Sequence, residues 1–290
     1  MNKKLKIVGI ALLMLSGLSL LLYPLISNIW NNHRQQQLIS TYVEAVEKAD
    51  EEELIDYKAQ ASMASTYNSN LVPSILPDSF AVAEAAEEED ESYMSCLNLN
   101  GDGIMGYVEI PKIGIKIPVF HGTSEEVLQI GAGHLEGSSL PIGGESTHSV
   151  LSAHRGLPSA SLFTDLDLME EGDHFYIKVL DQTLAYEVDQ ILVVEPEDTS
   201  ALMVEDGEDL VTLLTCTPYA VNTERLLVRG HRVPYEEGMI EEETVPLAGV
   251  SLHTNYGLWV VIGLAVTIAF IVALFFLDRY LRKKDSRTNA

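Results

Sequence analysis

Two long uncharged apolar runs set the first limit on how this 290-residue chain can fold. The first covers residues 7–29, IVGIALLMLSGLSLLLYPLISNI, and the second covers residues 257–277, GLWVVIGLAVTIAFIVALFFL. An α-helix rises about 1.5 Å per residue, so each run is long enough to cross the hydrocarbon core of a bilayer. The sequence therefore predicts a transmembrane helix near each end, with the folded part of the chain between them.

The charges that flank these runs predict their orientation. Basic residues precede the first run and follow the second: Lys3, Lys4, Lys6, Arg279, Arg282, Lys283 and Lys284. By the positive-inside rule the tails 1–6 and 278–290 are cytoplasmic, and the segment between the spans is extracellular. The first run could also be a cleaved signal peptide, but no A-x-A-like cleavage site follows it. We favour an uncleaved anchor, which gives a multi-pass protein of the cell membrane with two spans.

The net charge of −25 lies essentially between the spans, because both tails are basic. Nucleic acid is excluded as a partner, since its phosphates would be repelled. The acidity is compatible with a basic partner, although it is also an ordinary means of keeping a domain soluble.

Between the spans the pattern changes twice. Residues 30–71 are polar with helical spacing, including the apolar cluster Tyr42, Val43 and Val46, which predicts one or two helices. Residues 72–105 contain two prolines and the acidic run 84–91, which predicts a mobile loop. Residues 106–235 show short alternating runs separated by turn signals, so we expect a mainly β fold, a closed or nearly closed antiparallel barrel. Residues 236–256 form a short acidic linker.

Cys216 stands at the end of a predicted strand, DLVTLLTCTPY. Alternation places it on the same face as Leu214, and Pro218 ends the ladder just beyond it. The next strand begins near Arg225, and the loop TPYAVNTE would return it antiparallel to the first. Cys216 and Arg225 would then lie close together at the barrel rim, where a guanidinium favours the thiolate.

The missing partner of such a thiol is a base, and eight histidines are candidates. In THSVLSAHRGLP, alternation places Ser152 and His154 on one face, and the turn residues GLP end the strand directly after His154. His148 lies at the opposite end of that strand, and His134 lies in a glycine-flanked loop. Most histidines are structural or solvated, so position alone does not choose among them.

Together these motifs resemble those of the sortase family. TLLTCTPYAVNTERLLVRGHR is similar to the T-L-x-T-C signature, with an arginine nine positions after the cysteine. GAGHLEGSSLPIGG followed by HSVLSAHRG is similar to the family's histidine region, and GYVEIPKIGIKIPVFHG to its first strands. The resemblance covers roughly residues 106–233, and the separated motifs occur in the family's order.

The resemblance implies a closed eight-stranded sortase-type β-barrel with N-terminal helices. Cys216 would be the nucleophile, His154 the general acid/base, and Arg225 the group that holds the substrate or the developing oxyanion. The thiolate would cleave an LPxTG-like sorting signal between Thr and Gly, and an amine would resolve the thioacyl-enzyme. Thr215 and Ser152 are expected to contact substrate. No cofactor and no metal are expected.

The flanks of the barrel resemble class C sortases, which join the threonine of one pilin to a lysine of the next. These enzymes often carry a lid in which an Asp-Pro-aromatic motif covers the site. Here LPDSF supplies Asp78 as the expected partner of Arg225 and Phe80 as the plug, with Ser79 in place of the proline. Ala220 stands where the family usually has glycine, a change expected to have little effect.

Two alternatives to pilus assembly stay open at this stage. A housekeeping-type sortase would anchor surface proteins to a cell-wall amine. A catalytically idle barrel tethered to the membrane would bind or scaffold surface proteins without chemistry.

Two further features allow other interpretations. Cys96 and Cys216 could form a disulfide in an oxidising compartment, which would silence the nucleophile. NLNGDGIMGYVE places Asn98, Asn100 and Asp102 at EF-hand-like spacing for calcium. The first of these positions lacks a carboxylate and the following residues alternate as a strand, so we expect a tight turn into the barrel.

Overall fold

The computed structural model describes residues 3–51, 57–71, 78–82, 91–240, 261–268 and 271–272. The chain divides into two compact units, one made of residues 1–27 and 249–290 and the other of residues 28–248. The second unit contains all of the strands and the candidate site.

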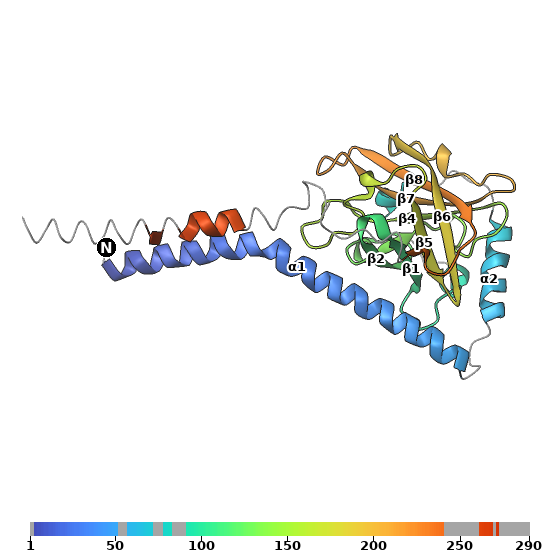
Figure 1. Ribbon diagram of the computed structural model, residues 1–290, viewed down its shortest axis with the longest axis horizontal. Coiled ribbons are helices and arrows are strands. Elements are labelled where there is room, and N and C mark those ends of the chain that lie inside the picture. Colours follow the sequence, from blue (N-terminus) through green and yellow to red (C-terminus); the bar gives the residue numbers. More distant parts are fainter. Residues whose placement is uncertain are drawn as a thin grey trace, which may run out of the picture. The chain divides into compact units, whose positions relative to one another are not determined.

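Eight strands form a closed barrel in the order β1-β2-β3-β4-β7-β8-β6-β5, which confirms the predicted fold class (Figure 1). The pairs β2–β3 and β4–β7 are parallel, so the expectation of a wholly antiparallel barrel is wrong. The physical reason is that crossover connections, which include α5 for the first pair and β5 and β6 for the second, return the chain in the same direction. The strands are β1 Ile104–Ile110, β2 Ile115–His121, β3 Ala132–His134, β4 Thr147–Ser152, β5 His174–Val179, β6 Gln182–Val194, β7 Asp209–Thr217 and β8 Glu224–Val233.

The main hydrophobic cluster takes residues from every strand and fills the barrel. On β7 its members are Val211 and Leu213, whereas Leu214 belongs to a second cluster against which Phe80 packs. Because side chains alternate along a strand, Cys216 has the outward orientation of Leu214. The candidate nucleophile therefore lies on the outer face of the barrel wall.

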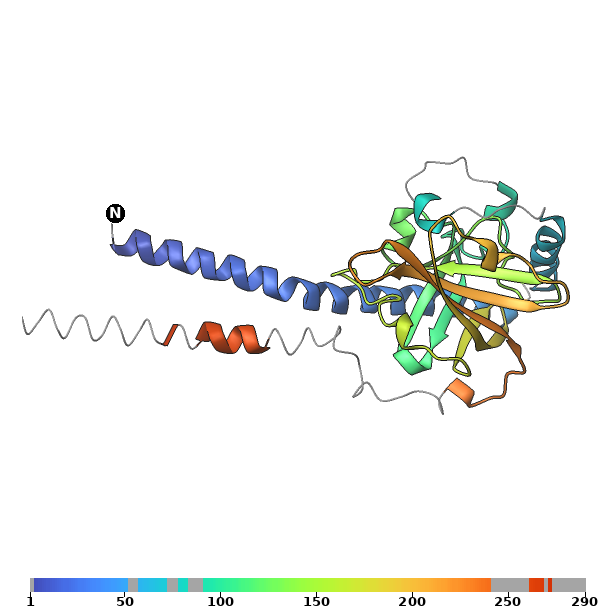
Figure 2. The same cartoon turned by 90° about the horizontal axis from the view of Figure 1, so that it is seen from above.

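Helix α1 (Lys3–Glu51) is continuous, so the predicted first span and the helix that follows it are one element. Its later part packs on the barrel through Ile39 and Tyr42. Helix α2 (Tyr57–Asn70) lies beside the barrel (Figures 1 and 2). Asn68 of this helix accepts from the Leu140 N–H at 2.7 Å through Oδ1 and donates from Nδ2 to the Leu140 carbonyl at 3.2 Å. The short helices are α3 Ser79–Val82, α4 Glu91–Met94, α5 Glu125–Leu128, η1 Pro111–Ile113, η2 Leu166–Leu168 and η3 Ser200–Leu202.

Within the part of the chain that the structure describes, one helix is long and apolar enough to cross a membrane, and it lies in α1. Of the predicted second span, residues 261–268 and 271–272 are helical, and the rest lies outside the described residues. Most of the acidic linker and all of the C-terminal tail also lie outside the described residues. In the smaller unit Gly263 faces Leu21, because a Cβ at this glycine would lie 3.1 Å from Leu21 Cδ1.

Tyr42 fastens α1 to the barrel. Its hydroxyl donates to the Met105 carbonyl at 3.0 Å and accepts from the Leu180 N–H at 2.8 Å, and the side chain is 2% exposed. Tyr42→Phe removes the acceptor of a buried amide, so we expect the free energy of unfolding to fall by about 1–3 kcal/mol. Urea denaturation of the full chain in detergent measures the change, and a loss below about 0.5 kcal/mol would contradict this role.

Candidate active site

Cys216 and Arg225 are direct partners across the antiparallel pair of β7 and β8. Directly opposed residues share a face of the sheet, so both side chains lie on the outer face of the barrel. The predicted proximity of thiol and guanidinium is therefore present. Cys216 is only 7% exposed, and its strand partner Arg225 is bound by Asp78.

His154 is brought to the same place by the parallel pairing of β4 with β7. The ladder pairs Ser152 with Leu214, and the Ala153 N–H donates to the Leu214 carbonyl at 3.1 Å. His154 follows Ser152 by two residues, as Cys216 follows Leu214. Both therefore lie two residues beyond the last pair of the β4–β7 ladder. The register therefore places His154 at the same end of β7 as Cys216.

Asp78 grips the candidate arginine with both carboxylate oxygens. Arg225 Nε lies 2.7 Å from Asp78 Oδ1 and Arg225 Nη2 lies 2.8 Å from Oδ2. Bidentate charge-assisted pairs of this kind are among the stronger hydrogen-bonded contacts in proteins. The arginine also donates from Nη1 to the carbonyls of Asn222 and Glu224, so its guanidinium is held from two sides.

Phe80 and Ser79 occupy the space between the candidate catalytic groups. The Phe80 ring centroid lies 5.3 Å from that of His154, and Arg225 Cζ lies 5.2 Å from the Phe80 ring centroid. The Ser79 hydroxyl accepts from Ser152 at 2.7 Å, and Ser79 is fully buried. The three residues of the Asp-Ser-Phe motif thus each contact a different part of the site.

The electrostatics of this covered state favour a neutral thiol. Burial raises the pKa of Cys216, the nearby Arg225 guanidinium lowers it, and the Asp78 carboxylate raises it again, with a net upward shift. The hydrogen bonds that Arg225 donates to Asp78 in turn raise the pKa of Arg225. Since the thiolate is the reactive form of cysteine, the covered site favours the unreactive form of the candidate nucleophile.

The two residues expected to contact substrate are both buried. Thr215 is fully buried and donates its hydroxyl to the Ala153 carbonyl at 2.7 Å. Ser152 is also fully buried and donates to Ser79. A substrate contact of Ser152 would follow displacement of Ser79, and for both residues the predicted contact stays a prediction.

Comparison with known proteins decides the family. Residues 108–233 match the sortase domain model. Sortase C from Streptococcus pneumoniae, whose crystal structure bears on catalysis and pilin substrate specificity, is 48% identical to this chain. Its structure matches with a TM-score of 0.61 and covers 69% of this chain and 97% of that one. The chain belongs to the sortase family. Sortase C-1 from Actinomyces oris is 44% identical with a TM-score of 0.58, covering 61% of this chain and 98% of that chain.

Curated sortases align over a shorter region. Sortase D of Bacillus subtilis is 30% identical over 131 residues, which are 44% of this chain and 63% of the relative. The chain covers 58% of sortase A of Streptococcus agalactiae, at 29% identity. The matched region therefore spans less than two thirds of these relatives, whereas it spans nearly all of the two solved sortase C chains.

The sequence reasoning missed two side chains of this sortase site. Glu125, at the start of α5, places Oε2 3.3 Å from His154 Nε2, and no pattern in the sequence indicated that this helix would reach the histidine. Arg155 is buried beside the site and binds Thr217, the residue after the cysteine. Its position directly after His154 was the only available signal.

Two other histidines of the sortase barrel are structural. His134 is fully buried, its Nδ1 lies 2.9 Å from the Tyr93 hydroxyl, and burial lowers its pKa to about 4. His148 Nε2 lies 2.8 Å from the Thr212 hydroxyl, and burial lowers its pKa as well. Neither lies within the contacts that surround Cys216.

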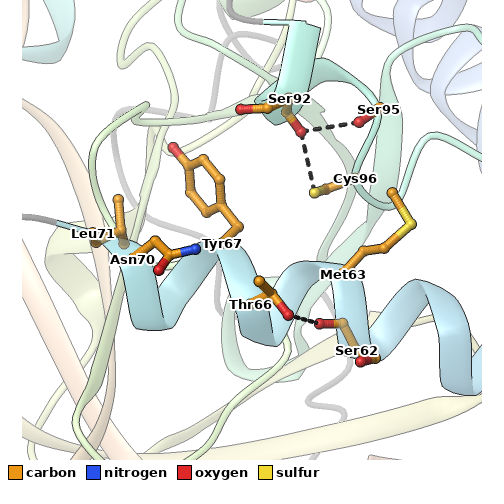
Figure 3. Close-up of a pocket in the computed structure, with 9 residues that line it drawn as sticks. All are labelled: Ser62, Met63, Thr66, Tyr67, Asn70, Leu71, Ser92, Ser95 and Cys96. Carbon is orange, nitrogen blue, oxygen red and sulfur yellow. Dashed lines mark hydrogen bonds between the residues drawn. The ribbon is translucent and has the colours of Figure 1, made fainter.

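Cys96 and Cys216 are not joined by a disulfide, so the disulfide alternative is wrong in this structure. Cys96 lies instead in the wall of a separate pocket of about 580 Å³ between α2 and residues 92–96 (Figure 3). Its thiol donates to the Ser92 carbonyl at 3.3 Å. None of the residues that line this pocket belongs to the Cys216 site.

The Asn-Gly-Asp-Gly segment forms the predicted turn into β1. Asn98 Oδ1 accepts from the Gly103 N–H at 3.0 Å, and Asp102 Oδ1 accepts from the Ile104 N–H at 3.1 Å. Gly101 and Gly103 have positive φ angles of 70° and 80°, which glycine adopts without strain. The side-chain oxygens of the EF-hand-like spacing thus shape the turn.

Proposed function

We propose that this sortase is a membrane-anchored cysteine transpeptidase that assembles pili. The observation that carries the proposal is the placement of Cys216 directly opposite Arg225, with His154 just beyond the end of the neighbouring strand β4. The similarity to sortases C at 42–49% identity supports pilin subunits as substrates. Its substrates would be pilins with LPxTG-like sorting signals.

In the proposed reaction His154 takes up the proton of the Cys216 thiol, and Sγ attacks the carbonyl carbon of the threonine in the sorting signal. Arg225 stabilises the negative charge that develops on the carbonyl oxygen. The Thr–Gly bond breaks as His154 donates a proton to the leaving glycine amine, which leaves a thioester between Sγ and the threonine. The ε-amine of a pilin lysine then attacks the thioester, gives up a proton to His154, and releases Cys216 with a new amide bond.

The Asp78–Phe80 segment would act as a lid on this reaction. The Asp78 carboxylate occupies the guanidinium that the oxyanion or the signal would need, and Phe80 lies against both His154 and Arg225. Substrate would therefore have to displace the segment, a step that also frees Arg225 to favour the thiolate. The serine in place of the family's proline keeps the lid, because Ser79 bonds Ser152.

Anchoring is proposed from the apolar helix α1 and from the predicted second span. A long apolar helix is consistent with attachment to the cell membrane. We place the barrel outside the cell and both tails in the cytoplasm, on the charge bias of the sequence. The pilin substrates would then meet the enzyme at the extracellular surface of the cell membrane.

The acceptor distinguishes the proposal from anchoring to the cell wall. The lid-free variant carries Asp78→Ala and Phe80→Ala together. It would be given a pilin with an LPxTG-like signal and either a lysine-bearing pilin or a cell-wall precursor amine. We expect covalent pilin ladders with the first and little product with the second. Transfer to the wall amine alone would favour a housekeeping sortase, and a Cys216 that ignores a thiol-reactive sorting-signal mimic would favour an idle scaffold.

A further inference from the structure

We propose that Arg155 is a positioning residue that holds Cys216 in register with His154 by binding Thr217. This inference rests on the proposed function. Arg155 Nη1 donates to the Thr217 hydroxyl at 3.1 Å, and the guanidinium connects the residue after His154 to the residue after Cys216. The Arg155 side chain is 5% exposed, so this connection is built into the body of the protein.

The contact continues a ladder that the backbone no longer provides. The β4–β7 pairing runs to Ser152 and Leu214, followed by the bond from the Ala153 N–H to the Leu214 carbonyl. Beyond it, two side-chain bonds join the same two chain segments. The Thr215 hydroxyl binds the Ala153 carbonyl, and Arg155 binds the Thr217 hydroxyl.

These two bonds lie one on each side of the catalytic pair. His154 stands between Ala153 and Arg155, and Cys216 stands between Thr215 and Thr217. A slip of one strand end past the other would break both bonds. The arrangement therefore fixes the relative position of thiol and imidazole, which must be aligned for proton transfer to the leaving amine.

Other contacts give Arg155 the rigidity that this role requires. Nη2 lies 2.5 Å from Asp167 Oδ2, and Nε donates to the Thr164 carbonyl at 3.1 Å. The ring of Tyr219 packs on the same loop, since a Cβ at Gly156 would lie 3.0 Å from Tyr219 Cε2. Two nitrogens of the guanidinium, Nη2 and Nε, are thus held by groups other than Thr217.

Thr217→Val is the sharpest test, because it removes the acceptor of Arg155 but keeps the shape of the side chain. We expect kcat for thioacyl formation to fall about ten- to a hundredfold, with KM and the melting temperature nearly unchanged. Thr217→Ser keeps the hydroxyl and should restore kcat. Alkylation of Cys216 by iodoacetamide should stay within about twofold of the parent, because it does not require His154.

Thr212→Val is the control on the same strand, since it removes the buried β7 hydroxyl that bonds His148 at 2.8 Å, away from Arg155. It should lower the melting temperature but leave kcat unchanged. If Thr217→Val keeps full kcat, or loses kcat only in proportion to stability as Thr212→Val does, the proposal for Arg155 is wrong. A parent enzyme without any thioacyl formation would instead refute the proposed function.

In that second case the ring NMR signals of His154 still test the positioning. We expect Thr217→Val, but not Thr217→Ser, to shift these signals. Unchanged signals in Thr217→Val would overturn the role given to Arg155, whatever the activity of the enzyme.

Discussion

Cys216→Ala is expected to abolish formation of the thioacyl-enzyme and of pilin polymers. Alanine offers no nucleophile, and loss of the nucleophile in an enzyme of this type lowers turnover by more than about 10⁴-fold. The fold should persist, because the substitution removes one sulfur atom at the surface of the barrel wall. Polymer formation by the full chain measured on denaturing gels, with the melting temperature in detergent, checks both parts.

Cys96→Ala is the matched control for this prediction. Cys96 is the other cysteine of the chain, is 3% exposed, and lines the separate pocket between α2 and residues 92–96. Its loss should leave polymerisation intact. If pilin ladders persist in Cys216→Ala and disappear in Cys96→Ala, Cys96 and not Cys216 is the nucleophile, and the account is wrong.

Opening the lid with Asp78→Ala and Phe80→Ala together is expected to speed alkylation of Cys216 at neutral pH by on the order of tenfold or more. Burial and the Asp78 charge both raise the pKa of this thiol, while Arg225 lowers it. The double substitution weakens both raising causes and leaves the lowering one, so the pKa should fall. More thiolate is then present at pH 7, and access to it is wider.

The pH dependence gives the sign of this effect a separate check. The gain in alkylation rate from thiolate formation should be largest below the raised pKa of the parent and should shrink as the pH rises through it. The measurement uses iodoacetamide in a Cys96→Ala background, so that one thiol is followed. A rate that is unchanged at every pH would mean that the Asp-Ser-Phe segment does not control the site.

Asp189→Asn is a control that breaks the carboxylate pair of another arginine on β8. Asp189 binds Arg229 of β8 with both oxygens, at 3.1 and 2.9 Å, as Asp78 binds Arg225. Breaking this pair should leave the reactivity of Cys216 unchanged. A comparable increase in Asp189→Asn would show that general loosening of β8, and not removal of the lid, exposes the thiol.

The β7–β8 part of the site was predictable because its information is local. Alternation along DLVTLLTC, the proline that follows, and a short return loop together place Cys216 opposite Arg225. The lid motif was predictable from resemblance only, since nothing in LPDSF itself indicates which strands it contacts.

The parallel pairing of β4 with β7 was not predictable from residue patterns. Its two strands are separated by β5 and β6, and periodicity gives the face of a side chain but not its partner strand. For the same reason the pattern did not show that Cys216 lies on the outer face, covered by a distant segment. Arg155 was missed because a burial that rests on Asp167, Thr164 and Thr217 depends on tertiary contacts.

The most direct test of the central claim is to trap the covalent intermediate on the lid-free enzyme. The protein would be incubated with an LPxTG-like peptide, digested, and analysed by mass spectrometry, with and without a lysine-bearing pilin. We predict an acyl adduct of the threonine-terminated fragment on Cys216, which disappears as the pilin lysine becomes acylated. An adduct on Cys96, or peptide cleavage without any adduct on Cys216, would contradict the account.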